Sequence, residues 1–389
     1  MVIAPAPGMA KTSAPLETPL RDKLDQLARF EPTGFPVISL YLDLTADQHG
    51  RETHEVFCRK AFAERLKALA PDSPEHGSVL ADIDRIDAYL AGVPRSANGL
   101  VIFASAGSGD FFETVQLDVP LGEHWLFVGT VPHLYPLARV ADQYPRYAVV
   151  ALDTNHARIL VFALGAVEKR DEVTGVKTRR SDMGGMSQAR YQRHAENFHL
   201  HHVRDVASAL DRVVREDAVQ HVVLAGDEVV IPMLKEKLTP AVAEKIVDVI
   251  PLDRQADDNR LARTTLDVLR RSDAQNDVER VEAVLGAWRA GGLGVAGPHA
   301  TMTALQQGQV DELLMVASPT ALTAVQSLPD AAPVVAETSA PNVPDDRQLQ
   351  LAHELVTGAH ATGARVRIIE DPALLEEHGG VAASLRFRI

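Results

Sequence analysis

Cysteine is almost absent from this sequence. The 389 residues contain a single cysteine, Cys58. One thiol cannot form an intrachain disulfide and cannot supply a multi-cysteine zinc site. The composition therefore excludes a disulfide framework and favours a reducing compartment, so we expect a cytoplasmic protein.

Long apolar runs are missing as well. The first fifteen residues lack a basic start followed by a sustained apolar core. No later run approaches the roughly 18 apolar residues that a membrane helix needs. We therefore expect neither secretion nor membrane insertion.

Common signatures of catalysis are also lacking. The sequence has no P-loop, no GxSxG elbow and no HExxH motif. Gly292, Gly294 and Gly297 formally match GxGxxG, but a dinucleotide fingerprint follows a strand and opens a helix, whereas these glycines follow a helical pattern. We interpret them as a linker between domains, and we expect no cofactor.

Acidic residues outnumber basic ones. There are 53 Asp and Glu against 39 Lys and Arg, which gives a formal net charge of −14. Such a charge argues against indiscriminate coating of nucleic acid but leaves room for a local basic site. With 46% hydrophobic residues the chain is globular, and its length favours two or three domains.

The order of predicted elements divides the chain into a tail and three mixed α/β domains. Residues 1–18 are rich in Pro and Ala and are expected to form a disordered tail. The N-terminal domain covers 19–143, the central domain 144–272 and the C-terminal domain 273–389. Each contains its own strands and helices, so the fold class is α/β throughout.

Periodicity predicts the elements within each domain. In the N-terminal domain we expect a helix at 19–30, a strand at 36–44, helices at 51–70 and 77–92, and strands at 99–105, 111–119 and 124–130. In the central domain we expect a hairpin of strands at 147–153 and 157–164, a charged loop from Glu168 to Met183, a helix at 187–216, a strand at 221–226, a helix at 228–238, a strand at 246–252 and a helix at 257–271. Alternating strands and helices indicate a largely parallel sheet in the central domain.

The C-terminal domain is predicted to be a small α/β sandwich. We expect helices at 275–290, 301–309 and 347–361, strands at 310–318, 364–370 and 384–389, and a surface loop from Pro329 to Pro344. Pro- and Ala-rich composition with little periodicity supports the loop.

A basic segment stands out against the acidic chain. Residues 177–204 carry six Lys and Arg against two Asp and Glu, a net charge of four, and the basic residues are Lys177, Arg179, Arg180, Arg190, Arg193 and Arg204. Gly184 and Gly185 allow the backbone to approach a ligand closely. The N-terminus of the following helix offers free N–H groups and a favourable dipole for a phosphate or an oxyanion. This arrangement suits an RNA 3′ end, while the alternative is a flexible connection followed by a solvated helix face.

Polar side chains of the predicted helix suggest what the segment does. Gln188 cannot act as a general base at neutral pH, so its chemical role would be to position a water or donate a hydrogen bond; otherwise it is a surface glutamine. His194, His199, His201 and His202 fall within nine residues. No acidic or cysteine ligand completes a metal site, so we expect no metal and interpret the histidines, His194 included, as facing phosphates.

The order of these features resembles a known family. A hairpin, a charged loop with Gly-Gly and Gln, a long basic helix and then VVLAGDE before another helix are similar to the central domain of the archaeo-eukaryotic class-one release factors and Pelota, including their bacterial relatives. GLVIFAS and HLYPL resemble the end of the family's N-terminal domain, and ALQQGQVDELLMV, ARVRIIE and GGVAASLRFRI resemble its C-terminal domain. The resemblance covers about residues 35–389 and implies a C-terminal kink-turn-binding, ribosomal-protein-like fold.

The resemblance assigns roles to the glycine segment. The family's Gly-Gly-Gln motif enters the peptidyl transferase centre, whereas this chain has Gly184-Gly185-Met186-Ser187-Gln188-Ala189-Arg190. That spacing resembles the GxxQxR pattern of the Vms-type branch. It implies that Gln188, with Gly184 and Gly185, takes the catalytic place and that Arg190 lies near tRNA. The N-terminal domain resembles an A-site or decoding-type domain, but it lacks the Asn-Ile-Lys-Ser motif, so reading of stop codons is not expected.

Two functions follow from this resemblance. The first is rescue: the protein binds the A site of a stalled ribosome, with rRNA and peptidyl-tRNA as partners, and promotes hydrolysis of the peptidyl-tRNA ester at the peptidyl transferase centre. The alternative is a non-catalytic, Balon-like hibernation factor that occupies the A site of idle ribosomes. An elongation-type translational GTPase is a further candidate partner, and a third, weaker hypothesis is a tRNA-handling protein that never meets a ribosome.

Overall fold

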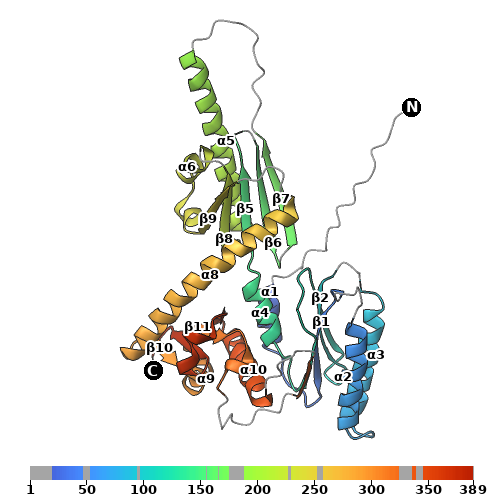
Figure 1. The fold of residues 1–389 in the computed structure, drawn as a ribbon. Coiled ribbons are helices and arrows are strands. Elements are labelled where there is room, and N and C mark those ends of the chain that lie inside the picture. Colours follow the sequence, from blue (N-terminus) through green and yellow to red (C-terminus); the bar gives the residue numbers. More distant parts are fainter. Residues whose placement is uncertain are drawn as a thin grey trace, which may run out of the picture. The chain divides into compact units, whose positions relative to one another are not determined.

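The structure is a computed structural model of the 389-residue chain. It describes residues 20–46, 53–93, 97–154, 156–164, 166–174, 188–226, 229–251, 257–323, 335–338 and 345–388, and for 188–198 the description is limited to the helical backbone. Within these residues, three separate sheets, each accompanied by helices, confirm the prediction of a mixed α/β chain (Figure 1). The described residues group into two compact units, 145–269 in one and 20–144 together with 270–389 in the other.

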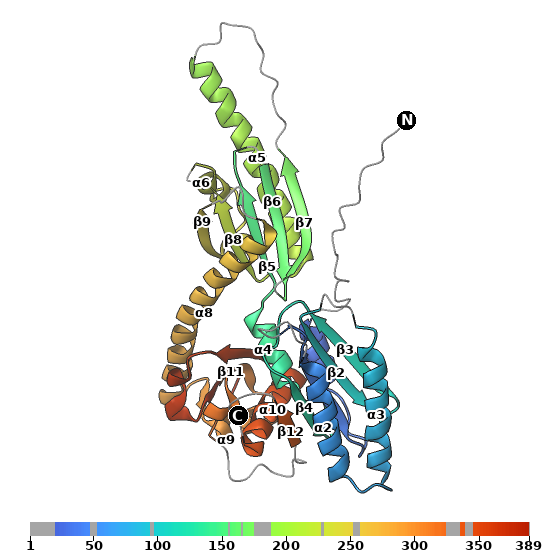
Figure 2. The same cartoon turned by 45° about the vertical axis from the view of Figure 1, so that its right-hand side comes forward.

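An antiparallel five-stranded sheet forms the N-terminal part of the larger unit. Its order is β12-β4-β1-β2-β3. The strands are β1 (Val37–Asp43), β2 (Gly99–Ser105), β3 (Phe111–Leu117), β4 (Trp125–Gly129) and β12 (Val335–Thr338), and the helices are α1 (Leu20–Leu27), α2 (His54–Ala68), α3 (Pro74–Leu90) and α4 (Tyr135–Gln143). Helices α2 and α3 cover one face of this sheet (Figure 2). Alternate residues of β1, such as Ile38 and Leu40, pack with these helices, while Tyr41 lies on the other face and contacts Phe127.

Strand β12 corrects the prediction of a surface loop from Pro329 to Pro344. Val335–Thr338 pairs antiparallel with β4, with Val335 opposite Val128 and Thr338 opposite Trp125. Glu337 on this strand forms an ion pair with Arg65 of α2. The strand has only four residues, too few for an alternating pattern to be recognised in the sequence, and its partner lies about 200 positions earlier.

The smaller unit contains the second sheet, of order β7-β6-β5-β8-β9. Its strands are β5 (Tyr147–Leu152), β6 (His156–Ala163), β7 (Ala166–Thr174), β8 (His221–Gly226) and β9 (Ile246–Pro251), and its helices are α5 (Gln188–Glu216), α6 (Val230–Lys235), α7 (Pro240–Ala243) and the first part of α8 (Asp258–Arg289). The hairpin β5–β6 is confirmed. The sheet is mixed rather than largely parallel, because β5, β8 and β9 are parallel while β6 and β7 add an antiparallel edge.

Strand β7 corrects the prediction of a charged loop that begins at Glu168. Its charged residues have partners: Lys169 Nζ lies 2.9 Å from Asp217, and Arg170 lies 2.5 Å from Asp258. Val167 and Val173 pack against the two cores of the unit. An edge strand needs few apolar residues, and this one therefore has the composition of a loop.

Helices cover both faces of the central sheet. Val206 and Leu210 of α5 pack with Val150 and Val222 on one face. On the other face, Leu261, Val268 and Leu269 of α8 pack with Tyr147 and Phe162. The apolar residues of α5 recur at helical spacing, which explains why a single face of this helix is buried.

The third sheet lies in the larger unit and has the order β10-β14-β11-β13. It consists of β10 (Gly294–Ala296), β11 (Val310–Val316), β13 (Arg365–Ile369) and β14 (Val381–Leu385), with α9 (Pro298–Gln306), α10 (Asp346–Ala361) and short 3₁₀ turns at Pro319–Ala321, Pro372–Leu374 and Glu376–His378. β11 and β13 are parallel, and β14 is antiparallel to β11. Strand β14, the last strand, begins and ends earlier than the strand predicted at 384–389.

Two further predictions in this region are wrong. Helices predicted at 257–271 and 275–290 are one continuous helix, α8, because the residues between them contain no Gly or Pro and Asp273 is held by Arg367 at 3.2 Å. The predicted linker contains strand β10. A Cβ on Gly294 would lie 2.5 Å from the carbonyl oxygen of Val284, so this glycine serves close packing on α8 rather than nucleotide binding. Within the described residues, no helix is both long and apolar enough to cross a membrane.

Candidate functional site

The predicted site residues fall into two groups. Lys177, Arg179, Arg180, Gly184 and Gly185 lie outside the described residues. The backbone of Gln188, Arg190, Arg193 and His194 lies on α5, whose first residue is Gln188. Their roles as catalytic and RNA-binding residues stay predictions.

The glycine segment lies between two described elements. Strand β7 ends at Thr174 and α5 begins at Gln188, so residues 175–187 join an edge strand to a helix. Ion pairs link β7 to the C-terminal end of α5: Lys169–Asp217 at 2.9 Å and Arg212–Asp171 at 3.4 Å. Each such pair at the surface contributes little by itself, on the order of 0–1 kcal/mol.

Helix α5 is longer than the sheet it covers. It has 29 residues, which at 1.5 Å per residue corresponds to about 44 Å. The strands beside it have six to nine residues, and the N-terminal half of α5 extends past their ends (Figures 1 and 2). This half is therefore held away from the core of its own unit.

The sequence of α5 agrees with that division. Buried apolar residues, spaced three or four apart, run from Val203 through Val206 and Leu210 to Val213. Continuing this spacing toward the N-terminus, the sequence has polar residues instead, namely His199, Glu196, Gln192 and Gln188. The N-terminal half of α5 consequently lacks the apolar stripe that would anchor it to a sheet.

Charge at the start of α5 is opposite to what helix stability favours. The N-terminus of a helix dipole is positive and is stabilised by Asp or Glu in the first turn. α5 has no acidic residue there, and Arg190 and Arg193 follow within two turns. The first N–H groups of a helix also lack intrahelical partners. This end of the helix is therefore a favourable place for an anion, at some cost in helix stability.

The histidines of α5 separate into different environments. His202 is 2% exposed, and burial lowers its pKa, so it is neutral near pH 7 and part of the core. His201 is exposed and His199 is half-buried. The expectation that these histidines face phosphates is thus wrong for His202. Among the residues that the structure describes, no three His, Cys, Asp or Glu side chains could hold a metal ion together.

A known protein family matches the central part of the chain. The family described as bacterial archaeo-eukaryotic release factor family 10 matches residues 132–270, which span the central sheet and α5. A search of curated proteins found no match. The central region of the chain, residues 132–270, is thus similar to the bacterial relatives of the archaeo-eukaryotic release factors.

Solved structures of termination factors and of Pelota and Dom34 match most of the chain, at low identity. The archaeal termination factor aRF1 is 16% identical, with 95% of this chain and 97% of that chain covered and a TM-score of 0.26. Dom34 from S. cerevisiae, a translation termination-like factor that interacts with Hbs1, is 11% identical over 75% of this chain and 79% of its own, with a TM-score of 0.43. Archaeal Pelota, bound to the ribosome with ABCE1, is 14% identical over 95% and 94%, with a TM-score of 0.41.

Proposed function

We propose that this protein is a cytoplasmic translation factor that binds the A site of stalled ribosomes and promotes hydrolysis of the peptidyl-tRNA ester. The observation that carries the proposal is helix α5. It belongs to a release-factor-like domain, projects past its sheet and begins at Gln188 without a single acidic residue in its first turn. Such a helix is suited to enter an environment rich in phosphate.

Each part of the segment has a chemical role in this proposal. In ester hydrolysis a water attacks the carbonyl carbon, an oxyanion develops on the carbonyl oxygen, and the tRNA 3′ oxygen leaves with a proton. Gln188 would position the water or donate a hydrogen bond to the oxyanion, and Gly184 and Gly185 would let the backbone approach the ester. Lys177, Arg179, Arg180, Arg190, Arg193 and His194 would contact tRNA or rRNA phosphates.

The proposal is tested with ribosomes that carry a stalled nascent peptide. Wild-type protein should release the peptide, and Gln188→Ala should slow release about 10²–10³-fold, as expected for loss of one preorganised donor. Gln192→Ala, four residues further along the same helix, is the matched control and should release peptide normally. Ribosome binding, measured by co-sedimentation, should be the same for all three proteins.

Two results would contradict catalysis. Wild-type protein that binds stalled ribosomes but frees no peptide would remove the hydrolytic role. Equal release by Gln188→Ala and wild-type protein would remove Gln188 from the reaction.

A non-catalytic role in hibernation is the second candidate. Two residues separate Gly185 from Gln188, and the glutamine backbone is already part of helix α5. A glutamine fixed in a helix has less freedom to reach an ester than one in a glycine loop. In this case the protein should co-sediment with vacant ribosomes, aided by an elongation-type GTPase, and should leave peptidyl-tRNA intact. Failure to bind vacant ribosomes would exclude this role.

A further inference from the structure

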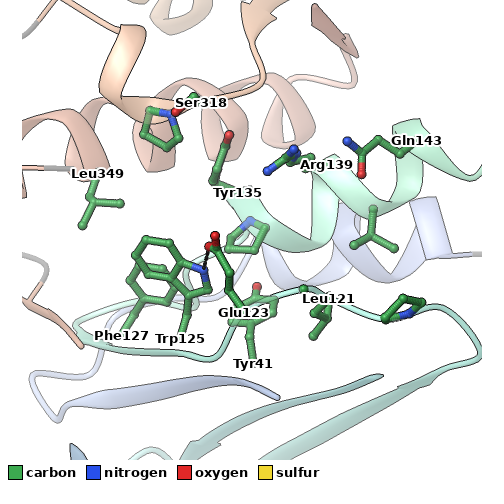
Figure 3. Close-up of a pocket in the computed structure, with 15 residues that line it drawn as sticks. Tyr41, Leu121, Glu123, Trp125, Phe127, Tyr135, Arg139, Gln143, Ser318 and Leu349 are labelled. Carbon is green, nitrogen blue, oxygen red and sulfur yellow. Dashed lines mark hydrogen bonds between the residues drawn. The ribbon is translucent and has the colours of Figure 1, made fainter. Parts of the chain in front are cut away.

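The larger unit contains a hollow that takes no part in the proposed reaction (Figure 3). It has a volume of about 400 Å³ and is bounded by β1, β4, the residues before β4, α4 and the turn at Ser318 and Pro319. Sites for small molecules in proteins usually measure about 300–1,000 Å³. The hollow is therefore large enough for a ligand of the size of a nucleotide.

Aromatic rings form the sheet side of the hollow. Trp125 and Phe127 are stacked, with ring centroids 5.4 Å apart and an angle of 4° between the planes. Tyr41 meets Phe127 edge to face at 6.0 Å. Phe127 is buried and covers one face of the indole, while Trp125 is only half-buried. The indole thus offers a flat surface on which another planar ring can stack.

A positive charge lies on the opposite side. Tyr135 and Arg139 are four residues apart on α4, so both face the hollow (Figure 3). The Nε of Arg139 is buried and has no hydrogen-bond partner in the described part of the chain. No carboxylate among the described residues forms an ion pair of 4.0 Å or less with this guanidinium. An anion placed in the hollow would supply the missing partner.

Glu123 supplies acceptors beside the aromatic wall. One of its oxygens accepts a hydrogen bond from the indole Nε1 of Trp125 at 3.2 Å. The carboxylate is directed from the sheet side toward α4 (Figure 3). A carboxylate has about four acceptor positions, so Glu123 can accept further N–H donors. It therefore favours a ligand whose edge carries donors next to the stacking surface.

We propose that this hollow binds a guanine nucleotide, with the base stacked on Trp125, its N–H edge on Glu123 and its phosphate on Arg139. Guanine is the standard base with two neighbouring N–H donors on its Watson–Crick edge, which match one carboxylate. Adenine and cytosine place an acceptor beside their donor, and that acceptor would face the negative charge of Glu123. An aromatic carboxylic acid without N–H donors would likewise be repelled by the carboxylate of Glu123.

The nucleotide can come from two sources with the same chemistry. One is a free guanine nucleotide, and the other is an unpaired guanosine in an RNA strand, since unstacked bases bind to proteins by stacking on aromatic side chains. The proposal does not rest on the function proposed above, because the hollow belongs to the unit that does not contain α5.

Fluorescence of Trp125 provides the test. The chain has two tryptophans, and Trp288 is 40% exposed, so Trp288→Phe leaves Trp125 as the only reporter in the full-length protein. GMP should quench this fluorescence in a saturable way and bind at least tenfold more tightly than AMP. Guanosine, which lacks the phosphate, should bind more weakly than GMP.

Two substitutions assign the contacts. Arg139→Gln should weaken GMP binding about tenfold and leave guanosine within twofold of its original affinity. Glu123→Gln should weaken GMP and guanosine alike and reduce the preference over AMP. Arg59→Gln, an exposed arginine on α2 with the same change of charge, is the matched control and should bind GMP normally. Should Arg139→Gln fail to fold, the ratio of GMP to guanosine affinity in the parent protein still reports the phosphate contact.

Short RNA distinguishes the two sources. The competitors are a U-rich RNA pentamer with one central G and an all-U pentamer. If only the G-containing pentamer displaces GMP, the natural ligand is a guanosine within an RNA strand. GMP binding without displacement by either RNA indicates a free nucleotide. The proposal would be overturned if neither GMP nor the G-containing RNA quenched the fluorescence in a saturable way. Equal affinity of the protein for GMP, AMP and guanosine would overturn it as well.

Discussion

A buried pair of histidines makes the stability of the larger unit sensitive to acid. The rings of His133 and His353 are stacked with centroids 4.9 Å apart, between the start of α4 and helix α10. His133 is 1% exposed and His353 is 5% exposed. Burial lowers the pKa of His353 to about 4, and burial with the charge of His353 lowers the pKa of His133. Both side chains are neutral in the folded protein at pH 7.

The sign of the effect follows from proton binding. In the unfolded chain a histidine has a pKa of about 6.5, so between about pH 6.5 and 4 the unfolded state binds more protons than the folded state. The free energy of unfolding then falls as the pH falls. The pKa of His353 alone is lowered by about 2.5, which at 1.36 kcal/mol per unit corresponds to about 3 kcal/mol of stability across this window. His133 adds a change of the same sign.

Urea unfolding of the full-length protein at several pH values between 4.5 and 8 measures the effect. His353→Phe keeps a ring beside His133 and removes the ionisable nitrogen. Overpacking can cost about 1–3 kcal/mol, but that cost does not depend on pH, so the quantity to compare is the slope of stability against pH. The slope should be smaller in His353→Phe than in wild type and unchanged in the control His299→Phe, whose histidine is exposed in the same unit. Equal slopes in wild type and His353→Phe would refute the reasoning.

Three further predictions concern other parts of the chain. Burial raises the pKa of Asp142 to about 7 despite its ion pair with Arg367, so wild type should lose stability relative to Asp142→Asn as the pH rises from about 4 to about 7; urea unfolding checks this, and a constant difference would contradict it. Leu210→Ala on α5 should lower the free energy of unfolding of the smaller unit by about 2–5 kcal/mol, seen as faster proteolysis of that unit. A change of under 1 kcal/mol would argue against the packing of Leu210 in the core. Arg190→Gln and Arg193→Gln should each weaken ribosome binding. The slope of log affinity against log salt concentration should become shallower by about 0.7–0.9 for each phosphate that is no longer neutralised, and an unchanged slope would assign these arginines to a solvated helix face.

Much of the fold could be predicted from periodicity. Residues 36–44 and 147–153 are rich in apolar and β-branched residues. Both segments contain a strand in which every residue is buried. The apolar spacing of α5 predicts a helix over 187–216, against an observed Gln188–Glu216. Such elements bury a complete face, so the residue pattern along the chain is sufficient to identify them.

The errors share a different cause. Strand β7 is an edge strand with charged residues, and β12 is a four-residue strand that pairs with β4 across a large separation in sequence. Helix α4 has no counterpart among the predicted elements. These segments obtain their hydrogen bonds, ion pairs or apolar partners from distant parts of the chain, and a local pattern does not record them.

The glycine segment, Gln188 and the basic residues around them can be found in the sequence, because a motif and a local excess of charge are properties of consecutive residues. The projection of α5 past its sheet and the burial of His202 were decided by tertiary packing. The same holds for the hollow beside Trp125: Glu123 and Trp125 precede Arg139 by more than a dozen residues, and Ser318 and Leu349 come from the far end of the chain. Only folding brings an aromatic surface, a carboxylate and a half-buried arginine to one place, since the distances between them are set by the packing of β1, β4, α4 and α10 and by nothing in the local sequence.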